Sequence, residues 1–394
     1  MNRKLRMGMV GGGRDAFIGA VHRMAAGLDG LVEFSAGALS SDPEKAKASG
    51  RDLFLPSDRI YTSYRELFEK EKARPDRVDF VSIVTPNHTH FEIAMAALDS
   101  GFPVMCEKPM TFNLEQAQML SEKVQSTGLL FGLTHNYTGY PMVKEARALV
   151  ASNAFGKIRK VVVEYPQGWL ATPLENSGQK QAAWRTDPGR AGASCCVGDI
   201  GTHAANLAEY ITSSQIESVC ADVASFVPSR KLDDDANVLL RFTSGAHGVL
   251  HASQICVDEE NGLNIRVYGE HGGLWWRQED PNSLHLRWAD RPRETIRTGV
   301  NYAHLSAAAR AATRLPAGHP EGFVEAFANL YRNYARTLAA KLEGRTPTPI
   351  DSDFPDVRAG VRGMAFIQSV IRSSDSDRKW TDVPHSESER RSEK

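Results

Sequence analysis

The stretch MGMVGGGRDAFIGAVH, residues Met7–His22, decides the fold. It joins an apolar run, Leu5–Val10, to three glycines in a row and then to an apolar helical pattern that starts at Phe17. A strand that enters a helix through a glycine-rich turn is typical of dinucleotide-binding domains. Glycines let the backbone approach a pyrophosphate, and the N–H groups at the start of a helix attract its negative charge.

The turn is longer than the usual G-x-G-x-x-G pattern. Gly11 and Gly13 fit, but Gly19 comes late, so the turn carries about three extra residues, Arg14–Ala16. Tight packing alone is the alternative explanation for the glycines, and a solvated side chain is the alternative to a phosphate contact for Arg14. The residues that we expect around the pyrophosphate are Gly11, Gly13, Arg14, Phe17 and Ile18.

Strand and helix patterns alternate through the first third of the chain. Apolar runs without alternation, separated by amphipathic helices, indicate a parallel sheet that is covered on both faces. We therefore expect a Rossmann-type, doubly wound, NAD(P)-binding domain over residues 1–139. Its strands are predicted at Leu5–Val10, Val32–Leu39, Val78–Thr85, Phe102–Cys106 and Leu129–Thr134, and its helices at Phe17–Leu28, Pro43–Ser49, Tyr64–Glu71, His88–Ser100 and Leu114–Ser126.

The pattern changes after Gly139. Alternating segments joined by short turns predict an α+β domain over residues 140–383, built on a large, open, mainly antiparallel sheet. Such a sheet leaves one face to cover, which favours a homo-oligomer. Residues 384–394 are polar and predict a disordered tail. The predicted strands are Lys157–Gln167, Glu217–Val227, Asn237–Phe242, Gly248–Val257, Asn264–Gly269 and Ser283–Trp288, with helices at Pro141–Ala151, Glu321–Leu342 and Asp356–Arg372.

Composition narrows the functional classes. The 394 residues carry a net charge of -1, which gives no general attraction to nucleic acid or anionic membranes. No apolar run approaches the roughly 20 residues that span a bilayer. The five cysteines are odd in number and form no C-x-x-C pair, which argues against a disulfide framework and a zinc site. We expect a cytoplasmic protein without a metal.

The second predicted strand ends where the adenosine ribose of a dinucleotide usually lies. The acid that commonly accepts from the 2′-OH of NAD is replaced there by Ser40. Ser40 with Lys45 nearby suits a 2′-phosphate, which tilts the expectation to NADP. Asp42 is the alternative acceptor for NAD, although its place before Pro43 is also that of a helix N-cap.

Two motifs follow neighbouring strands at the carboxyl edge, where open α/β sheets bind ligands. The first, Thr85–His90, reads T-P-N-H-T-H, and the second, Glu107–Pro109, reads E-K-P. The charge of Lys108 would stabilise an alkoxide that forms as an alcohol is oxidised. A surface ion pair is the alternative for Lys108 and Glu107. The cofactor contacts expected here are Thr85, Pro86, Asn87, His90, Glu107 and Lys108.

A third motif, Gly198–His203, opens an apolar helix. Asp199 and His203 are four residues apart and are expected on one helical face. The carboxylate would orient the imidazole and raise its basicity, so that His203 takes a hydroxyl proton. The alternative is an N-cap aspartate and a buried histidine.

Taken together, these motifs resemble a known family. A glycine-rich first turn, T-P-N-x-x-H, E-K-P and then D-x-x-x-H about ninety residues later are similar to the glucose–fructose oxidoreductase, inositol dehydrogenase and rhizopine catabolism (Gfo/Idh/MocA) family. The resemblance runs from Leu5 to about Val383. It implies a Rossmann domain, an open-sheet domain used in dimer or tetramer contacts, and Lys108, Asp199 and His203 as catalytic residues. Family members act mostly on sugars, inositols and related polyols with NAD or NADP.

The resemblance also points to further substrate contacts. Asn136 and Tyr137 follow the last strand of the first sheet, while Trp169 and Arg185 lie in the loop-rich stretch before Asp199. Aromatic faces and bidentate polar groups suit a hydroxylated ring, and packing is the alternative for each of them. His319 either reaches the pocket or caps the late helix.

We expect an NAD(P)-dependent dehydrogenase that interconverts a ring secondary alcohol and a ketone on a sugar, glycoside or inositol-type substrate. Two other functions stay open. One is a redox-neutral lyase, epimerase or glycosidase that retains its NAD(P). The other is a non-catalytic NAD(P)-sensing regulator.

Overall fold

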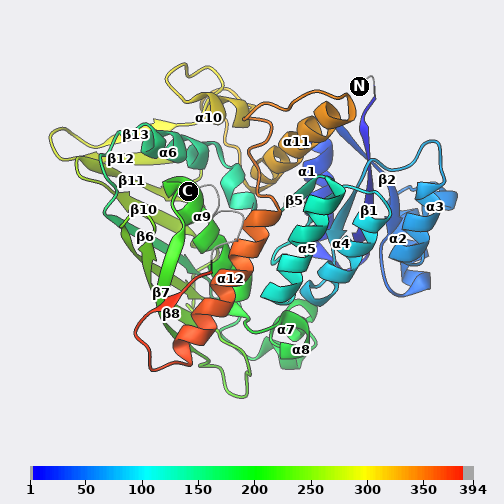
Figure 1. Cartoon of the computed structure of the whole chain (residues 1–394), viewed down its shortest axis with the longest axis horizontal. Coiled ribbons are helices and arrows are strands. Elements are labelled where there is room, and N and C mark those ends of the chain that lie inside the picture. The colour runs from blue at the N-terminus through cyan, green and yellow to red at the C-terminus, as the bar shows by residue number, and fades with distance from the viewer. Residues whose placement is uncertain (1–2, 385–394) are drawn as a thin grey trace. The chain divides into compact units, whose positions relative to one another are not determined.

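The computed structural model describes residues 3–384 and divides into two compact units (Figure 1). Unit 1 comprises Met1–Gly139 and Phe323–Gly360, and unit 2 comprises Tyr140–Gly322 and Val361–Lys394. The expected tail, residues 384–394, falls outside the described residues except for Pro384.

Unit 1 contains the predicted parallel sheet. Its five strands lie in the order β2-β1-β3-β4-β5, and every neighbouring pair is parallel. Since β1 has β2 on one side and β3 on the other, the strand order reverses at β1, which is where doubly wound sheets bind ligands at their carboxyl edge. The bounds are β1 Leu5–Gly11, β2 Val32–Ala38, β3 Phe80–Val84, β4 Val104–Cys106 and β5 Phe131–Leu133.

Helices connect these strands, and their caps explain where they begin. Asp42, Ser63 and Asn113 each accept a hydrogen bond from a backbone N–H in the first turn of α2, α3 and α5. The helix after the glycine turn, α1, has no side-chain cap. The bounds are α1 Phe17–Leu28, α2 Pro43–Asp52, α3 Tyr64–Lys72, α4 His90–Asp99 and α5 Leu114–Thr127, with short 3-10 helices η1 Ser57–Arg59, η2 Asn87–Thr89 and η3 Asn136–Gly139.

The late helix α11, Phe323–Leu342, groups with unit 1, which corrects the expected division at residue 139. Its side chains Phe327, Tyr331 and Tyr334 are buried in one apolar core with residues of β1 and α1. The ring of Phe327 also packs edge-on against that of His22 at 4.7 Å. Helical periodicity identified α11 correctly, but it does not say which domain its apolar face joins.

Unit 2 is built on a nine-stranded sheet in the order β13-β12-β11-β10-β6-β9-β8-β7-β14. Its described pairs are antiparallel except for β6 with β9, which are parallel. The sheet strands are β6 Lys160–Pro166, β7 Ile216–Ala224, β8 Asp235–Phe242, β9 His247–Ser253, β10 Asn264–Tyr268, β11 Gly272–Arg277, β12 Ser283–Trp288, β13 Glu294–Arg297 and β14 Thr381–Asp382.

Sequence patterns missed three of these strands, β11, β13 and β14. β11 opens with two glycines, which also suit a turn, and β13 and β14 are short edge strands with few apolar residues. The helical elements of the unit are α6 Pro141–Ala151, η4 Leu174–Ser177, α7 Lys180–Arg185, α8 Pro188–Ala191, η5 Val197–Gly201, α9 Thr202–Thr212, α10 Ala307–Ala312 and most of α12 Val357–Ser374.

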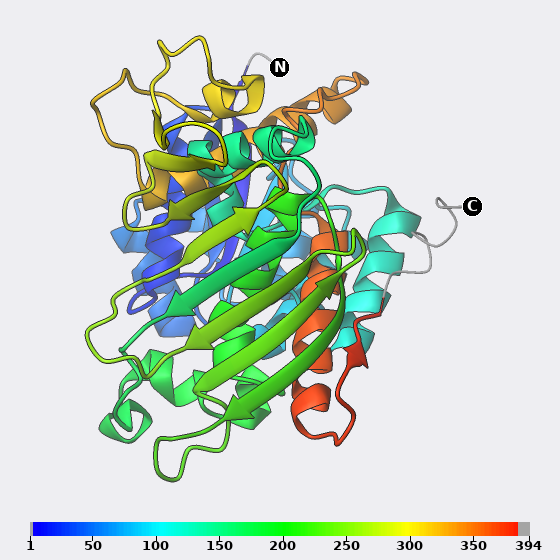
Figure 2. The same cartoon turned by 90° about the vertical axis from the view of Figure 1, so that its left-hand side faces the viewer.

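The two faces of the large sheet differ. Burial alternates along β6 and β8, with Val161, Val163 and Val238 on the buried side. Helices α6 and α9 pack on that side, while the broad opposite face carries no helix among the described residues of unit 2 (Figure 2). No helix in residues 3–384 is long and apolar enough to cross a membrane.

Candidate active site

The glycine turn of unit 1 has the backbone that a close approach requires. Gly11 and Gly12 have φ values of +83° and +73°, a region that other residues rarely adopt. A Cβ on Gly19 would lie 2.3 Å from the Cα of Gly12, so α1 packs directly on the turn. Although Gly19 comes late in the sequence, it therefore does what the third glycine of the usual pattern does.

The start of α1 fits a pyrophosphate. No side chain caps its first N–H groups, and its first turn contains no acidic residue. Phe17 is largely exposed there, and Ile18 is half-buried against the core. Backbone donors without a competing carboxylate at a helix start are what a phosphate requires, so these residues fit a dinucleotide.

The extra residues of the turn are tied to α2 by two ion pairs. The guanidinium of Arg14 binds both carboxylate oxygens of Asp52, at 2.6 and 2.9 Å. Nζ of Lys45 donates to Asp15 at 2.6 Å. Both cations that the sequence suggested for phosphate contacts are thus paired with carboxylates.

The end of β2 shows a helix cap. Asp42 accepts from the backbone N–H of Lys45 at 3.0 Å, and the hydroxyl of Ser40 accepts from the N–H of Asp42 at 3.1 Å. The N-cap interpretation of Asp42 is therefore the one that the structure shows.

His90 lies fully buried between the two motif loops. One ring nitrogen is 2.7 Å from the carbonyl oxygen of Thr85, and the other is 2.9 Å from that of Pro109. Burial lowers the pKa of His90. Both nitrogens join the loop of Thr85 to the loop of Lys108, and the contact of His90 with a cofactor stays a prediction. Asn87 is also buried, and Pro86 begins the short helix η2.

Glu107 is the centre of a polar cluster beneath Lys108. Its Oε1 accepts from the hydroxyl of Thr134 at 2.6 Å and lies 2.8 Å from Nε2 of His22, while Oε2 accepts from the backbone N–H of Lys108 at 3.1 Å. Burial alone would raise the pKa of Glu107, but the hydrogen bond from His22 and the charges of His22 and Lys108 outweigh it and lower that pKa. The carboxylate holds the Lys108 backbone.

The cluster continues into the core through residues that the sequence analysis did not single out. Nδ1 of His22 lies 2.6 Å from the hydroxyl of Tyr331, which in turn lies 2.8 Å from the hydroxyl of Ser82. His22 ends the quoted stretch of sequence, and Tyr331 comes from α11, some three hundred residues later. Because they are so far apart in the chain, no local pattern pairs them.

Residues after β5 also face the carboxyl edge. Nδ2 of the buried Asn136 has no hydrogen-bond partner among the described residues. An orphaned buried donor is unusual and fits a ligand acceptor. The ring of Tyr137 packs 6.3 Å from that of Phe323. Burial and then the charge of Lys108 lower the pKa of the neighbouring His135 to about 3.

Unit 2 brings three of the predicted substrate residues together. The guanidinium of Arg185 donates to Asp199 at 3.1 Å and lies over the ring of Trp169 at 5.9 Å. It also lies 4.3 Å from the ring centre of Trp184. Nε2 of Gln254, which the sequence analysis missed, donates to the same oxygen of Asp199 at 3.0 Å.

Asp199 lies in η5, a π-helical turn, and not in the expected α-helix. π-Helical turns are rare in proteins, and those that occur are often found at functional sites. Asp199 caps neither η5 nor α9, so the N-cap alternative is wrong. His203 lies one turn further on in α9 and is buried, with its ring 6.4 Å from that of Tyr165.

Further polar groups surround Tyr165 at the end of β6. Its hydroxyl donates to Oδ1 of Asn261 at 2.7 Å, and the amide of Gln167 donates to the same oxygen at 2.9 Å. The indole of Trp169 donates to Gln167 at 3.1 Å. Aromatic faces beside amides are the groups that bind hydroxylated rings.

Two buried carboxylates hold the loops of this site. Asp233 accepts from the backbone N–H groups of Cys195 and Val197, at 2.7 and 2.8 Å, and so fixes the chain just before Asp199. Arg230 pairs with Asp234 at 3.1 Å and donates to the carbonyl of Leu170 at 2.9 Å. Burial raises the pKa of Asp233.

His319 is exposed in a loop, 3.3 Å from the carbonyl oxygen of Pro316. It does not cap α11, which begins at Phe323. Among residues 3–384, no group of three or more His, Cys, Asp or Glu side chains is arranged to hold a metal ion.

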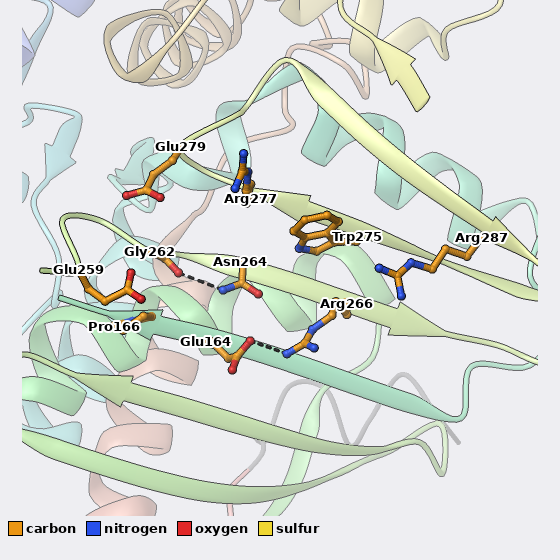
Figure 3. Close-up of a pocket in the computed structure, with 10 residues that line it drawn as sticks. All are labelled: Glu164, Pro166, Glu259, Gly262, Asn264, Arg266, Trp275, Arg277, Glu279 and Arg287. Carbon is orange, nitrogen blue, oxygen red and sulfur yellow. Dashed lines mark hydrogen bonds and ion pairs between the residues drawn. The ribbon is translucent and has the colours of Figure 1, made fainter. Parts of the chain in front are cut away.

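A separate hollow of about 520 Å³ lies on the open face of the large sheet (Figure 3). Its residues come mainly from β6, β10, β11 and β12, and include Trp275 and the ion pair of Arg266 with Glu164. It does not include Asp199 or His203.

A glycine turn that suits a phosphate, a switch point in a parallel sheet and a lysine loop at its carboxyl edge are features of a dinucleotide-binding Rossmann fold. Comparison with known proteins identifies the family. Residues 5–135 match the family model described as an oxidoreductase family with a NAD-binding Rossmann fold, and residues 143–275 match the GFO/IDH/MocA C-terminal domain. The chain belongs to the Gfo/Idh/MocA family of NAD-binding oxidoreductases.

Similar proteins cover between 75% and 97% of the chain. An uncharacterized oxidoreductase of Bacillus subtilis, YfiI, is 34% identical over 97% of this chain and 98% of its own. The crystal structure of an inositol dehydrogenase homolog complexed with NAD+ from Azotobacter vinelandii is 36% identical, covers 97% of this chain and 98% of its own, and has a TM-score of 0.92. A levoglucosan dehydrogenase of Pseudarthrobacter phenanthrenivorans is 26% identical over 75% of this chain and 81% of its own.

Proposed function

We propose that this protein oxidises a secondary alcohol on the ring of a cyclitol or pyranose, and reduces the ketone in the reverse direction. The observation that carries the proposal is the cluster of Asp199, Arg185, Gln254 and Trp169 in unit 2. A carboxylate held by a guanidinium and an amide, beside an indole face, suits a neutral ring with several hydroxyls. A structure of the Azotobacter vinelandii homolog, 35% identical, contains NADH and myo-inositol.

The proposed roles follow from the chemistry of each side chain. Lys108 places a positive charge at the oxygen that becomes a carbonyl and stabilises its alkoxide. His203 accepts the hydroxyl proton, and Asp199 orients the imidazole and favours its charged form. When NAD(H) is bound, its nicotinamide supplies the hydride acceptor or donor. Asn136 would place its unpaired amide donor on the bound cofactor or the substrate.

We infer that the cofactor is NAD, although the sequence favoured NADP. The prediction of NADP was based on Ser40 and Lys45, but Lys45 is paired with Asp15 at 2.6 Å. Arg14, the other nearby cation, is paired with Asp52. A 2′-phosphate that binds either cation would therefore lie beside a carboxylate.

We also propose a homo-oligomer through the open face of the large sheet. The hollow on that face contains Trp275 and three arginines, and tryptophan and arginine are enriched at subunit contacts. The expected cytoplasmic location stays a prediction.

The test is nucleotide reduction with a panel of inositols, pyranoses and anhydro sugars. We expect NADH to accumulate with at least one of them, and Lys108→Ala to lower kcat by about a thousandfold, within the range known for a lost electrostatic stabiliser. Lys70→Ala, an exposed lysine of α3, is the matched control. An unchanged kcat in Lys108→Ala overturns the role of Lys108.

The other two functions predict different results. A redox-neutral enzyme would be purified with nucleotide bound and would act without added NAD. A sensor would bind NAD but turn over none of the panel. The choice among the three functions therefore needs the purified protein and these two measurements.

A further inference from the structure

The subsite for the adenosine ribose is unusual in this chain. In Rossmann folds an acid at the end of the second strand accepts from the ribose hydroxyls of NAD. Ser40 holds that place here, and its hydroxyl accepts from the backbone of Asp42. The common acid is therefore absent from this place in the chain.

The lengthened glycine turn lies against the same strand end. The backbone N–H of Gly13 donates to the carbonyl of Leu39 at 3.1 Å, and a Cβ on Gly13 would lie 2.6 Å from that oxygen. The residues that follow Gly13 are the inserted ones. The insertion therefore places its side chains beside the ribose subsite.

Asp15 has an uncommon backbone in that insertion. Its φ of 63° is left-handed, a conformation that aspartate adopts more readily than most residues other than glycine. A hydrogen bond from the N–H of Ala16 to the carbonyl of Gly13 closes the turn around it. Its carboxylate is exposed and reaches Lys45 on α2.

The charges of this corner cancel. Two cations, Arg14 and Lys45, are paired with two carboxylates, Asp52 and Asp15. A 2′-phosphate brings a further charge of about −1.5 to −2. At either cation this phosphate would lie beside a carboxylate that repels it.

We propose that Asp15, carried by the lengthened turn, takes the place of the missing acid after β2 and selects NAD(H) over NADP(H). Its carboxylate accepts from the ribose hydroxyls and repels a 2′-phosphate, while Lys45 holds it in position. The inference rests on the proposed function only through the cofactor, so it is tested by binding and without a substrate.

The experiment measures dissociation constants of NADH and NADPH by calorimetry. We expect the unaltered protein to bind NADH at least tenfold more tightly than NADPH, and Asp15→Asn to narrow that ratio by tenfold or more. Asp15→Gly, which keeps the left-handed backbone, should narrow it as much. Glu44→Gln is the control, because it removes a carboxylate from the same region that pairs with Lys47.

Three results overturn the inference: an unaltered protein that prefers NADPH, an unchanged ratio in both Asp15 variants, or an equal change in Glu44→Gln. Failure to find a substrate would leave these binding ratios intact, so it counts against the proposed function alone. If neither nucleotide binds, both proposals fail.

Discussion

Nε2 of His22 lies 2.8 Å from Oε1 of Glu107, and both side chains are buried. If one of them is removed, water therefore has little access to take its place as a hydrogen-bond partner. This contact joins α1, which begins at the phosphate turn, to the loop that carries Lys108. A buried carboxylate that loses its partner is costly. The pair therefore couples the stability of unit 1 to the position of the lysine.

His22→Leu should lower the free energy of unfolding by about 3 kcal/mol, since it leaves the Glu107 carboxylate buried with one partner fewer. Urea denaturation measures the loss. Ser82→Ala removes only the far end of the cluster and should cost about 1 kcal/mol. Equal losses in the two variants would mean that the carboxylate does not depend on His22.

Gly19→Ala should weaken NADH binding at least tenfold and destabilise unit 1 by about 1–3 kcal/mol. The added Cβ would lie 2.3 Å from backbone Cα of Gly12, so the turn or the helix has to move. Gly27→Ala, in the same helix, meets nothing within 4 Å and should stabilise by about 0.5–1 kcal/mol. Calorimetry and urea denaturation separate the two effects. Tolerance of Gly19→Ala would show that the late glycine has no part in packing the turn.

His135 makes stability fall in acid. Burial, helped by the charge of Lys108, lowers its pKa in the folded state to about 3. An unfolded histidine takes up a proton below a pH of about 6.5. Between these values the unfolded state binds the extra proton, so the stability that is present above pH 6.5 is lost as the pH falls.

The loss attributable to His135 should reach about 2 kcal/mol between pH 6.5 and pH 5. His135→Asn should remove that part of the slope. The measurement is the free energy of unfolding of both proteins at the two pH values. Identical slopes would show that His135 takes up its proton in the folded protein as readily as in the unfolded one.

Local patterns predicted most of this fold because each carries its own physical cause. Phe17–Leu28 and Pro141–Ala151 have the helical bounds that their periodicity predicts. The parallel sheet follows from buried runs between helices. Features that depend on tertiary packing could not be predicted from local patterns. Helix α11 belongs to unit 1 because its aromatic face packs in the core of that unit. Strand β11 was missed because it begins with glycines that also suit a turn.

The residues of the candidate site likewise fall into two groups, those that a local motif predicted and those that only the tertiary structure brings to the site. Gly11, Lys108 and Asp199 were singled out because their motifs are local in sequence. Partners from distant segments, such as Tyr331 and Gln254, carried no such signal. The loop-joining role of His90 carried no signal either, because a histidine in a ligand-edge motif and one that joins two loops look alike until their hydrogen bonds are known.

Arg185→Ala should separate substrate binding from cofactor binding. Its guanidinium holds one oxygen of Asp199 and lies over two indoles, so its loss frees the carboxylate and unstacks Trp184. We expect KM for the ring substrate to rise and kcat to fall, each by about tenfold, a total cost of roughly 3 kcal/mol in kcat/KM. The dissociation constant of NADH should not change. Arg190→Ala, an exposed neighbour, is the control. If Arg185→Ala instead weakens NADH binding and leaves KM as it was, then the cluster around Asp199 belongs to the cofactor and the substrate contacts must come from other residues.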